Sequence, residues 1–196
     1  MPKVRCSDIQ QLPLRNIVSL LLIERAKQEL INGDVTLAIL LSAVAVETET
    51  AHLFVKWRGI DSGKLLGNQT PEDKKNWQSE WANMRSIGRR LEELSRFLTR
   101  KPFDEFARLR LDLLKPALTD YPPATSIKDF FQTELFDRRN DVVHYGKIDF
   151  DEADGRKCLS LASALLELFH AMDMKRADAL DEARRKYREA TATTAE

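Results

Sequence analysis

Three side chains that can act on a phosphodiester lie close together in residues 139–144, which read RNDVVH. The guanidinium of Arg139 can donate two parallel hydrogen bonds to phosphate oxygens as negative charge builds up on them. The imidazole of His144 can act as an acid or a base near neutral pH. Asn140 can orient either partner through its side-chain amide. The pattern predicts a site that holds a phosphate and moves a proton.

These side chains fall near the end of residues 126–146, a stretch with the signals of one amphipathic helix. Ser126 is a favourable N-cap, and Gly146 stands where a helix ends through a left-handed residue. Along a helix, positions 139 and 144 are about 7.5 Å apart in height and about 140° apart in direction. The apolar residues expected on the buried stripe are Ile127, Phe131, Leu135, Val142 and Tyr145.

Cleavage of RNA by its own 2′-hydroxyl needs a base, an acid and a cation at the phosphorus, but no metal ion and no cofactor. One copy of the motif supplies only one histidine. Two copies related by a two-fold axis would supply two histidines and two arginines, so the chemistry favours a homodimer.

The rest of the chain predicts an all-α protein. It has 196 residues with only seven Gly and seven Pro, which leaves few turns for an all-β fold. We expect a single domain over residues 1–190 and a disordered tail at 191–196. The predicted helices are 14–32, 35–58 ending at Gly59, 71–98, 103–118, 126–146 and 151–190.

Composition narrows the class of protein further. The 31 basic and 31 acidic residues balance, so bulk charge does not point to nucleic acid. Cys6 and Cys158 have no disulfide or metal-binding spacing, which suits a reducing compartment. No stretch resembles a signal peptide or reaches the roughly 20 apolar residues of a membrane span. We therefore expect a cytoplasmic protein without a membrane partner.

The run from Arg139 to His144, with a polar residue directly after the arginine, resembles the Arg-x4-6-His motif of the HEPN superfamily. The apolar second helix with its acidic residues (SAVAVETETAHLFVKW) is similar to that family as well. The resemblance covers roughly residues 14–58 and 126–170, and it leaves residues 60–125 as an extra helical segment. It implies an all-helical, dimeric domain. Many members are metal-independent endoribonucleases of toxin–antitoxin, phage-defence or RNA-processing systems, and others are non-catalytic modules that bind RNA, nucleotides or proteins.

The resemblance assigns the catalytic pair to Arg139 and His144, with Asn140 in support. Members that an antitoxin modifies carry a tyrosine two residues after the histidine, where this chain has Gly146. Tyr145 instead follows His144 directly. That antitoxin mechanism is therefore not implied, although an antitoxin or another regulatory protein stays among the expected partners.

One acidic residue in the second helix needs a partner. Glu47 lies on the same predicted face as Leu40, Val44, Ala51 and Phe54, and a buried carboxylate is costly unless it is paired. We expect it to reach Arg138 or Arg139 from the second helix. Arg138 is nearer the middle of the predicted apolar stripe, and Arg139 lies at its edge.

The alternatives to catalysis are structural. His144 could simply end its helix, and Arg139 could serve a structural ion pair, which would leave a binding module or a helical adaptor. His52 and His170 read as packing or surface residues. The basic residues between positions 85 and 115 read as a solvated face.

Overall fold

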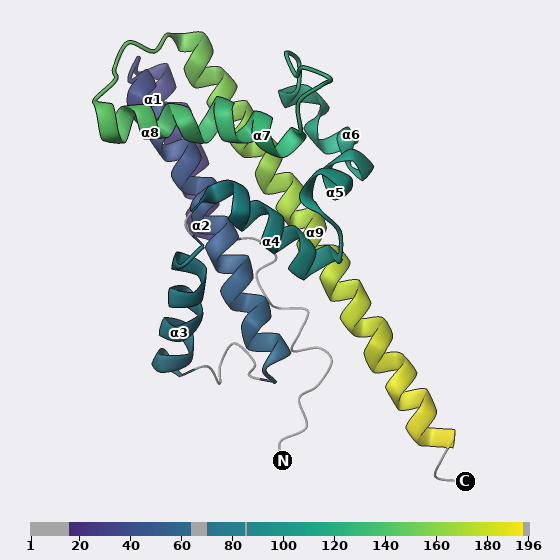
Figure 1. Ribbon diagram of the computed structural model, residues 1–196. Coiled ribbons are helices and arrows are strands. Elements are labelled where there is room, and N and C mark those ends of the chain that lie inside the picture. The colour runs from purple at the N-terminus through teal and green to yellow at the C-terminus, as the bar shows by residue number, and fades with distance from the viewer. Residues whose placement is uncertain (1–15, 64–69, 85, 194–196) are drawn as a thin grey trace.

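The computed structural model describes residues 16–63, 70–84 and 86–193, and these ranges contain only helices and the loops between them (Figure 1). The predicted all-α class is confirmed. Leu14, Cys6, Arg85 and residues 194–196 lie outside the described residues. The helices are α1 (Ile17–Ile31), α2 (Val35–Asp61), α3 (Pro71–Ala82), α4 (Ile87–Thr99), α5 (Phe103–Leu109), α6 (Leu111–Leu114), η3 (Lys115–Ala117), α7 (Ile127–Phe131), η4 (Gln132–Asp137), α8 (Arg138–Tyr145) and α9 (Glu152–Thr193).

Helices α1, α2 and α9 form the framework of the bundle. The α1–α2 hairpin turns at Gly33, where φ is 85°, and the Asp34 side chain caps α2 by accepting from the Leu37 amide at 2.9 Å. Helix α9 packs along α2, and its C-terminal part extends past the other helices (Figure 1). It continues through residues 191–193, which the sequence had assigned to a disordered tail.

Helix α2 is the most buried of the long helices, as its apolar composition predicts. It continues through the buried Gly59 to Asp61, and the left-handed glycine that follows is Gly63, with φ of 74°. The predicted end at Gly59 is therefore wrong, because packing overrides the weak helix propensity of a single glycine. Contrary to the expectation from sequence, α2 also has the length and apolar composition of a membrane span. Of that apolar window, 56% is buried inside the protein.

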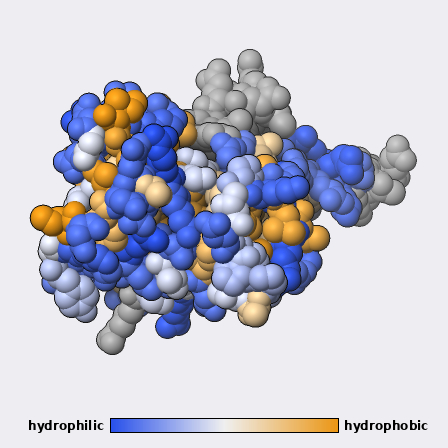
Figure 2. All heavy atoms as spheres, turned by 90° about the horizontal axis from the view of Figure 1, so that it is seen from above, coloured by the Kyte–Doolittle hydropathy of each residue, from blue (hydrophilic) through white to orange (hydrophobic). Residues whose placement is uncertain are grey.

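The segment between α2 and the motif helix is helical, as expected, but more broken than the sequence predicts. Thr70 and Asp73 form a capping box at the start of α3. The predicted helix 71–98 is two helices, because the Ser86 side chain caps a new start by accepting from the Arg89 amide. Helix α4 ends at Arg100, which is left-handed with φ of 64°. Seen from above, hydrophobic residues reach the surface only in separate patches (Figure 2).

The motif helix is continuous from α7 through η4 to α8, but η4 is a π-helical segment. Ser126 caps its start and Gly146 ends it with φ of 63°, as predicted. A π turn holds one extra residue, which shifts the direction of every later side chain by about 100°.

The predicted buried stripe therefore holds only as far as the π segment. Ile127, Phe131 and Leu135 are buried. Beyond η4 the stripe is wrong, since Val142 is half-buried and Tyr145 is 82% exposed.

Candidate functional site

Arg139 faces helix α2, where it meets the predicted acidic partner. Its Nη2 lies 3.5 Å from Oε2 of Glu47, and its Nη1 donates to Oδ1 of Asn140 at 3.0 Å. Its Nε is buried and has no hydrogen-bond partner among the described residues. The expectation that Glu47 reaches one of the two arginines is confirmed, and Arg139 is the one it reaches. Glu47 itself is only half-buried, and Val44 on the same face is 36% exposed, so this face of α2 is partly open to solvent.

Arg138 points to a different helix. Its Nη2 lies 3.0 Å from Oε2 of Glu134, and its Nη1 donates to Asp154 near the start of α9. Lys157 holds the same Glu134 oxygen at 2.9 Å. Burial favours the protonated acid, but hydrogen bonds from Lys157 and Arg138 outweigh it and lower the pKa of Glu134. Arg138 therefore fastens the motif helix to α9 and does not contact Glu47.

Cys158 on α9 faces the motif helix from the interior of the bundle. Its Sγ donates to the backbone carbonyl of Glu134 at 3.4 Å, inside the π segment. Burial raises the pKa of the Cys158 thiol to about 12. This cysteine is a buried, neutral thiol that supports the π segment, and it is not a nucleophile.

His144 and Tyr145 lie in the last turn of α8 and are exposed. Within the described ranges, the His144 side chain forms no hydrogen bond or ion pair, so no side-chain contact joins it to Arg139 in one copy of the chain. Apolar neighbours are exposed beside it: Val143 is 52% exposed, and Ile148 in the following loop is 76% exposed.

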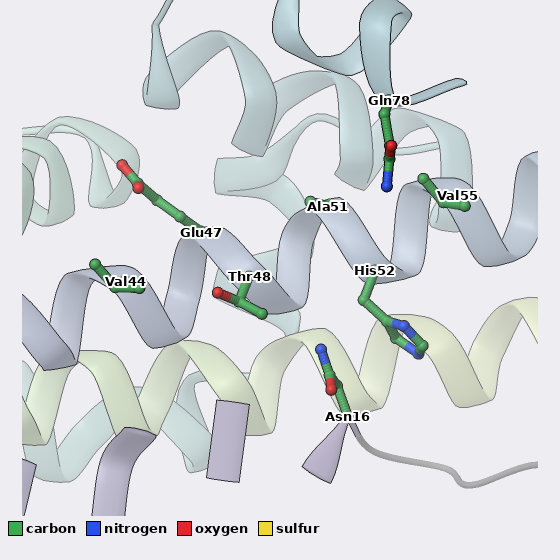
Figure 3. Close-up of a pocket in the computed structure, with 8 residues that line it drawn as sticks. All are labelled: Asn16, Val44, Glu47, Thr48, Ala51, His52, Val55 and Gln78. Atoms are coloured by element: carbon green, nitrogen blue, oxygen red, sulfur yellow. The ribbon is translucent and has the colours of Figure 1, made fainter. Parts of the chain in front are cut away.

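An open groove of about 490 Å³ runs along α2. Glu47 lines this groove and also pairs with Arg139. The floor of the groove comes from α2, while Asn16 and Gln78 lie on opposite sides of it (Figure 3). The residues that line it are Asn16, Val44, Glu47, Thr48, Ala51, His52, Val55 and Gln78. Sequence reasoning missed this groove, because its walls come from segments that are far apart in the chain.

A buried polar cluster of Lys56, Trp57 and Asp173 affects the pKa of His52. Lys56 on α2 donates to both carboxylate oxygens of Asp173 on α9 at 2.8 Å, and the Trp57 indole donates to Oδ1 at 2.6 Å. Burial, and then the charge of Lys56, lower the pKa of His52. His52 is therefore a neutral imidazole at pH 7.

Metal ligation has no candidate in the part of the chain that the structure describes, where no three His, Cys, Asp or Glu side chains are grouped to hold an ion. Comparison with protein-family models, with curated proteins and with solved structures gives no match. The functional conclusion therefore depends on the geometry around Arg139.

Proposed function

We propose that the protein is a HEPN-type endoribonuclease that cleaves RNA in the cytoplasm without a metal ion, at a site shared by two copies of the chain. The observation that carries the proposal is the position of Arg139. Its guanidinium is held between Glu47 and Asn140 and keeps 26% of its side-chain surface open to solvent. A cation fixed in place and still accessible is what a phosphate in the transition state requires.

The reaction assigns one role to each group. One His144 removes the proton from the 2′-hydroxyl, whose oxygen attacks the neighbouring phosphorus. His144 of the partner subunit donates a proton to the departing 5′-oxygen, while Arg139 stabilises the charge on the phosphorane. The products carry a 2′,3′-cyclic phosphate and a 5′-hydroxyl.

Two features of α8 favour a shared site over one built in a single copy. Positions 139 and 144 diverge by about 140° around a helix, and Arg139 turns toward α2 while His144 stays in solvent. The apolar side chains of Val143, Tyr145 and Ile148 are exposed around His144, where a second copy would cover them.

The test is cleavage of bulk or transfer RNA in the presence of a chelator. We expect products with cyclic-phosphate ends, and no cleavage by His144→Ala or Arg139→Ala. Sedimentation should show a dimer for all three proteins. Cleavage that persists in His144→Ala would remove the acid–base role. Growth arrest on expression, relieved by Arg139→Ala, would place the enzyme among toxins or phage-defence ribonucleases, with an antitoxin or regulator as its partner.

A second candidate is a HEPN-like module that binds RNA, a nucleotide or a protein without cleaving anything. The exposed position of His144, away from Arg139 in one copy of the chain, favours it, because binding needs the cation and not the imidazole. It predicts that Arg139→Ala weakens binding and that no turnover occurs under any condition.

A further inference from the structure

The groove on α2 is neutral, although it lies beside a charged site. Among the described residues that line it, Glu47 is the one with a charge, and this carboxylate is engaged with Arg139 at 3.5 Å. His52 is uncharged at pH 7, because burial and the nearby ammonium of Lys56 lower its pKa. A phosphate would meet the Glu47 carboxylate here, with no cation among the described residues of the wall. The groove therefore suits an uncharged group attached to something anionic that is held at Arg139.

The polar groups of the groove match the edge of a heterocycle. Gln78, on the exposed face of α3, points into the groove from one side, and Asn16 lies across from it (Figure 3). Asn16 is held in place, because its Oδ1 accepts from the Val18 amide at 3.0 Å. The side-chain amides of Gln78 and of Asn16, through its Nδ2, make no hydrogen bonds within the described residues. Asparagine and glutamine amides are the side chains that pair with adenine and other base edges.

The groove also contains the flat ring of His52 and a small apolar floor. The His52 ring projects from α2 at the Asn16 side, and Val44, Ala51 and Val55 follow along the same helix (Figure 3). Unpaired RNA bases stack on histidine and other aromatic rings in many proteins. An amphipathic peptide helix would need a longer apolar surface than these three small side chains provide.

We infer that this groove receives one unpaired base of single-stranded RNA, stacked on His52, with its edge read by Gln78 and Asn16. The inference deepens the proposed function and depends on it for the identity of the ligand as RNA. Glu47 separates the base in the groove from the phosphate at Arg139, since it lines the groove and also holds the guanidinium. The groove then determines which nucleotide lies beside the scissile bond.

The test measures binding separately from cleavage, in a full-length His144→Ala background. Fluorescence anisotropy with four tetranucleotides that differ at one position gives a dissociation constant for each base. We expect one base to bind best. Loss of one stacked base weakens binding by about 5- to 150-fold, so His52→Ala should do so, whereas His52→Phe should retain the affinity. Gln78→Ala should reduce the preference among the four bases. Asn76→Ala, an exposed polar substitution on α3 that does not line the groove, is the matched control.

Each outcome decides one proposal. Dissociation constants that change less than twofold in both His52→Ala and Gln78→Ala, or tetranucleotides that do not bind at all, would overturn the groove assignment. If the His52 variant does not fold, the exposed Gln78 variant decides alone. Base-selective binding in a protein whose wild type never cleaves RNA would refute the ribonuclease and leave the groove standing. Unchanged cleavage preference of His52→Ala and Gln78→Ala in a chain that keeps His144 would overturn the groove assignment and leave the ribonuclease standing.

Discussion

The ion pair between Glu47 and Arg139 gives the sharpest quantitative prediction. The two atoms are 3.5 Å apart, and the side chains are 28% and 26% exposed. At that separation, an effective dielectric constant of about 20 gives an attraction of about 5 kcal/mol before any desolvation cost. Fully exposed pairs retain about 0–1 kcal/mol, and losing one partner of a buried pair costs about 3–5 kcal/mol. For this intermediate burial, we expect a net coupling energy of about 1–2 kcal/mol.

A double-mutant cycle measures that coupling. The variants Glu47→Gln, Arg139→Gln and their combination replace each charge with a neutral polar side chain. Urea unfolding at a fixed protein concentration gives the free energy of unfolding of each. The matched control is the cycle of Glu47→Gln with Arg138→Gln, because Arg138 binds Glu134 and Asp154 instead. Side chains that share no contact should add to within about 0.5 kcal/mol.

The same variants separate a positioning role from a purely structural one. If Glu47 fixes the guanidinium for the transition state, Glu47→Gln should lower kcat about tenfold, which corresponds to about 1.4 kcal/mol, and leave KM nearly unchanged. A structural pair would change the unfolding free energy and not kcat. A coupling below about 0.5 kcal/mol in the Arg139 cycle, or a larger one in the Arg138 cycle, would refute the reasoning.

Three further predictions test other parts of the chain. Deletion of the exposed Thr133 should convert the π segment to α-helix and abolish the coupling between Glu47 and Arg139, as the same double-mutant cycle would show. Burial raises the pKa of Glu49, whose Oε2 has no hydrogen-bond partner among the described residues. The native state therefore keeps the proton of Glu49 longer than the unfolded state does, and its contribution to stability is lost as the pH rises above the unfolded pKa. Glu49→Gln should thus be more stable than wild type at pH 7 and equal to it near pH 4, by urea unfolding at each pH. Arg100→Gly should raise the unfolding free energy by about 0.5–1 kcal/mol, because a left-handed conformation suits glycine; an unchanged or lower value would contradict this.

The parts of the fold that the sequence predicts well are those fixed by short-range hydrogen bonds. Asp34, Thr70 and Ser126 each cap the helix that follows them, and Asp151 accepts from the Asp154 amide at 2.9 Å at the start of α9. A cap involves residues only two or three positions apart, so its residue types alone carry the information. Ser86 caps α4 in the same way, and the prediction of one helix over residues 71–98 did not use that signal.

The parts that the sequence does not predict depend on contacts between distant segments. Helix α2 passes through Gly59 because that residue is buried. The buried pair of Lys56 with Asp173 joins residues 117 positions apart, and no local pattern indicates it. The groove likewise forms only because Asn16 and Gln78, from distant parts of the chain, line opposite sides of the same stretch of α2. The prediction that Glu47 pairs with an arginine succeeded because a charge on an apolar face requires a partner wherever the partner lies in the chain.

The choice between the two arginines shows how the fold sets up the site. Without an insertion, the phase set by Ile127, Phe131 and Leu135 would place Arg138 toward α2 and Arg139 at the edge of the stripe. The extra residue in η4 shifts the phase by about 100°, which brings Arg139 to Glu47 and turns Arg138 toward Asp154. Two adjacent arginines thus serve two different helices, one fastening α8 to α9 and the other held at α2 beside the groove. A uniform α-helix of the same sequence would aim Arg138 at α2 and leave Arg139 at the edge of the stripe, so the π segment is the element on which the proposed position of the catalytic cation depends.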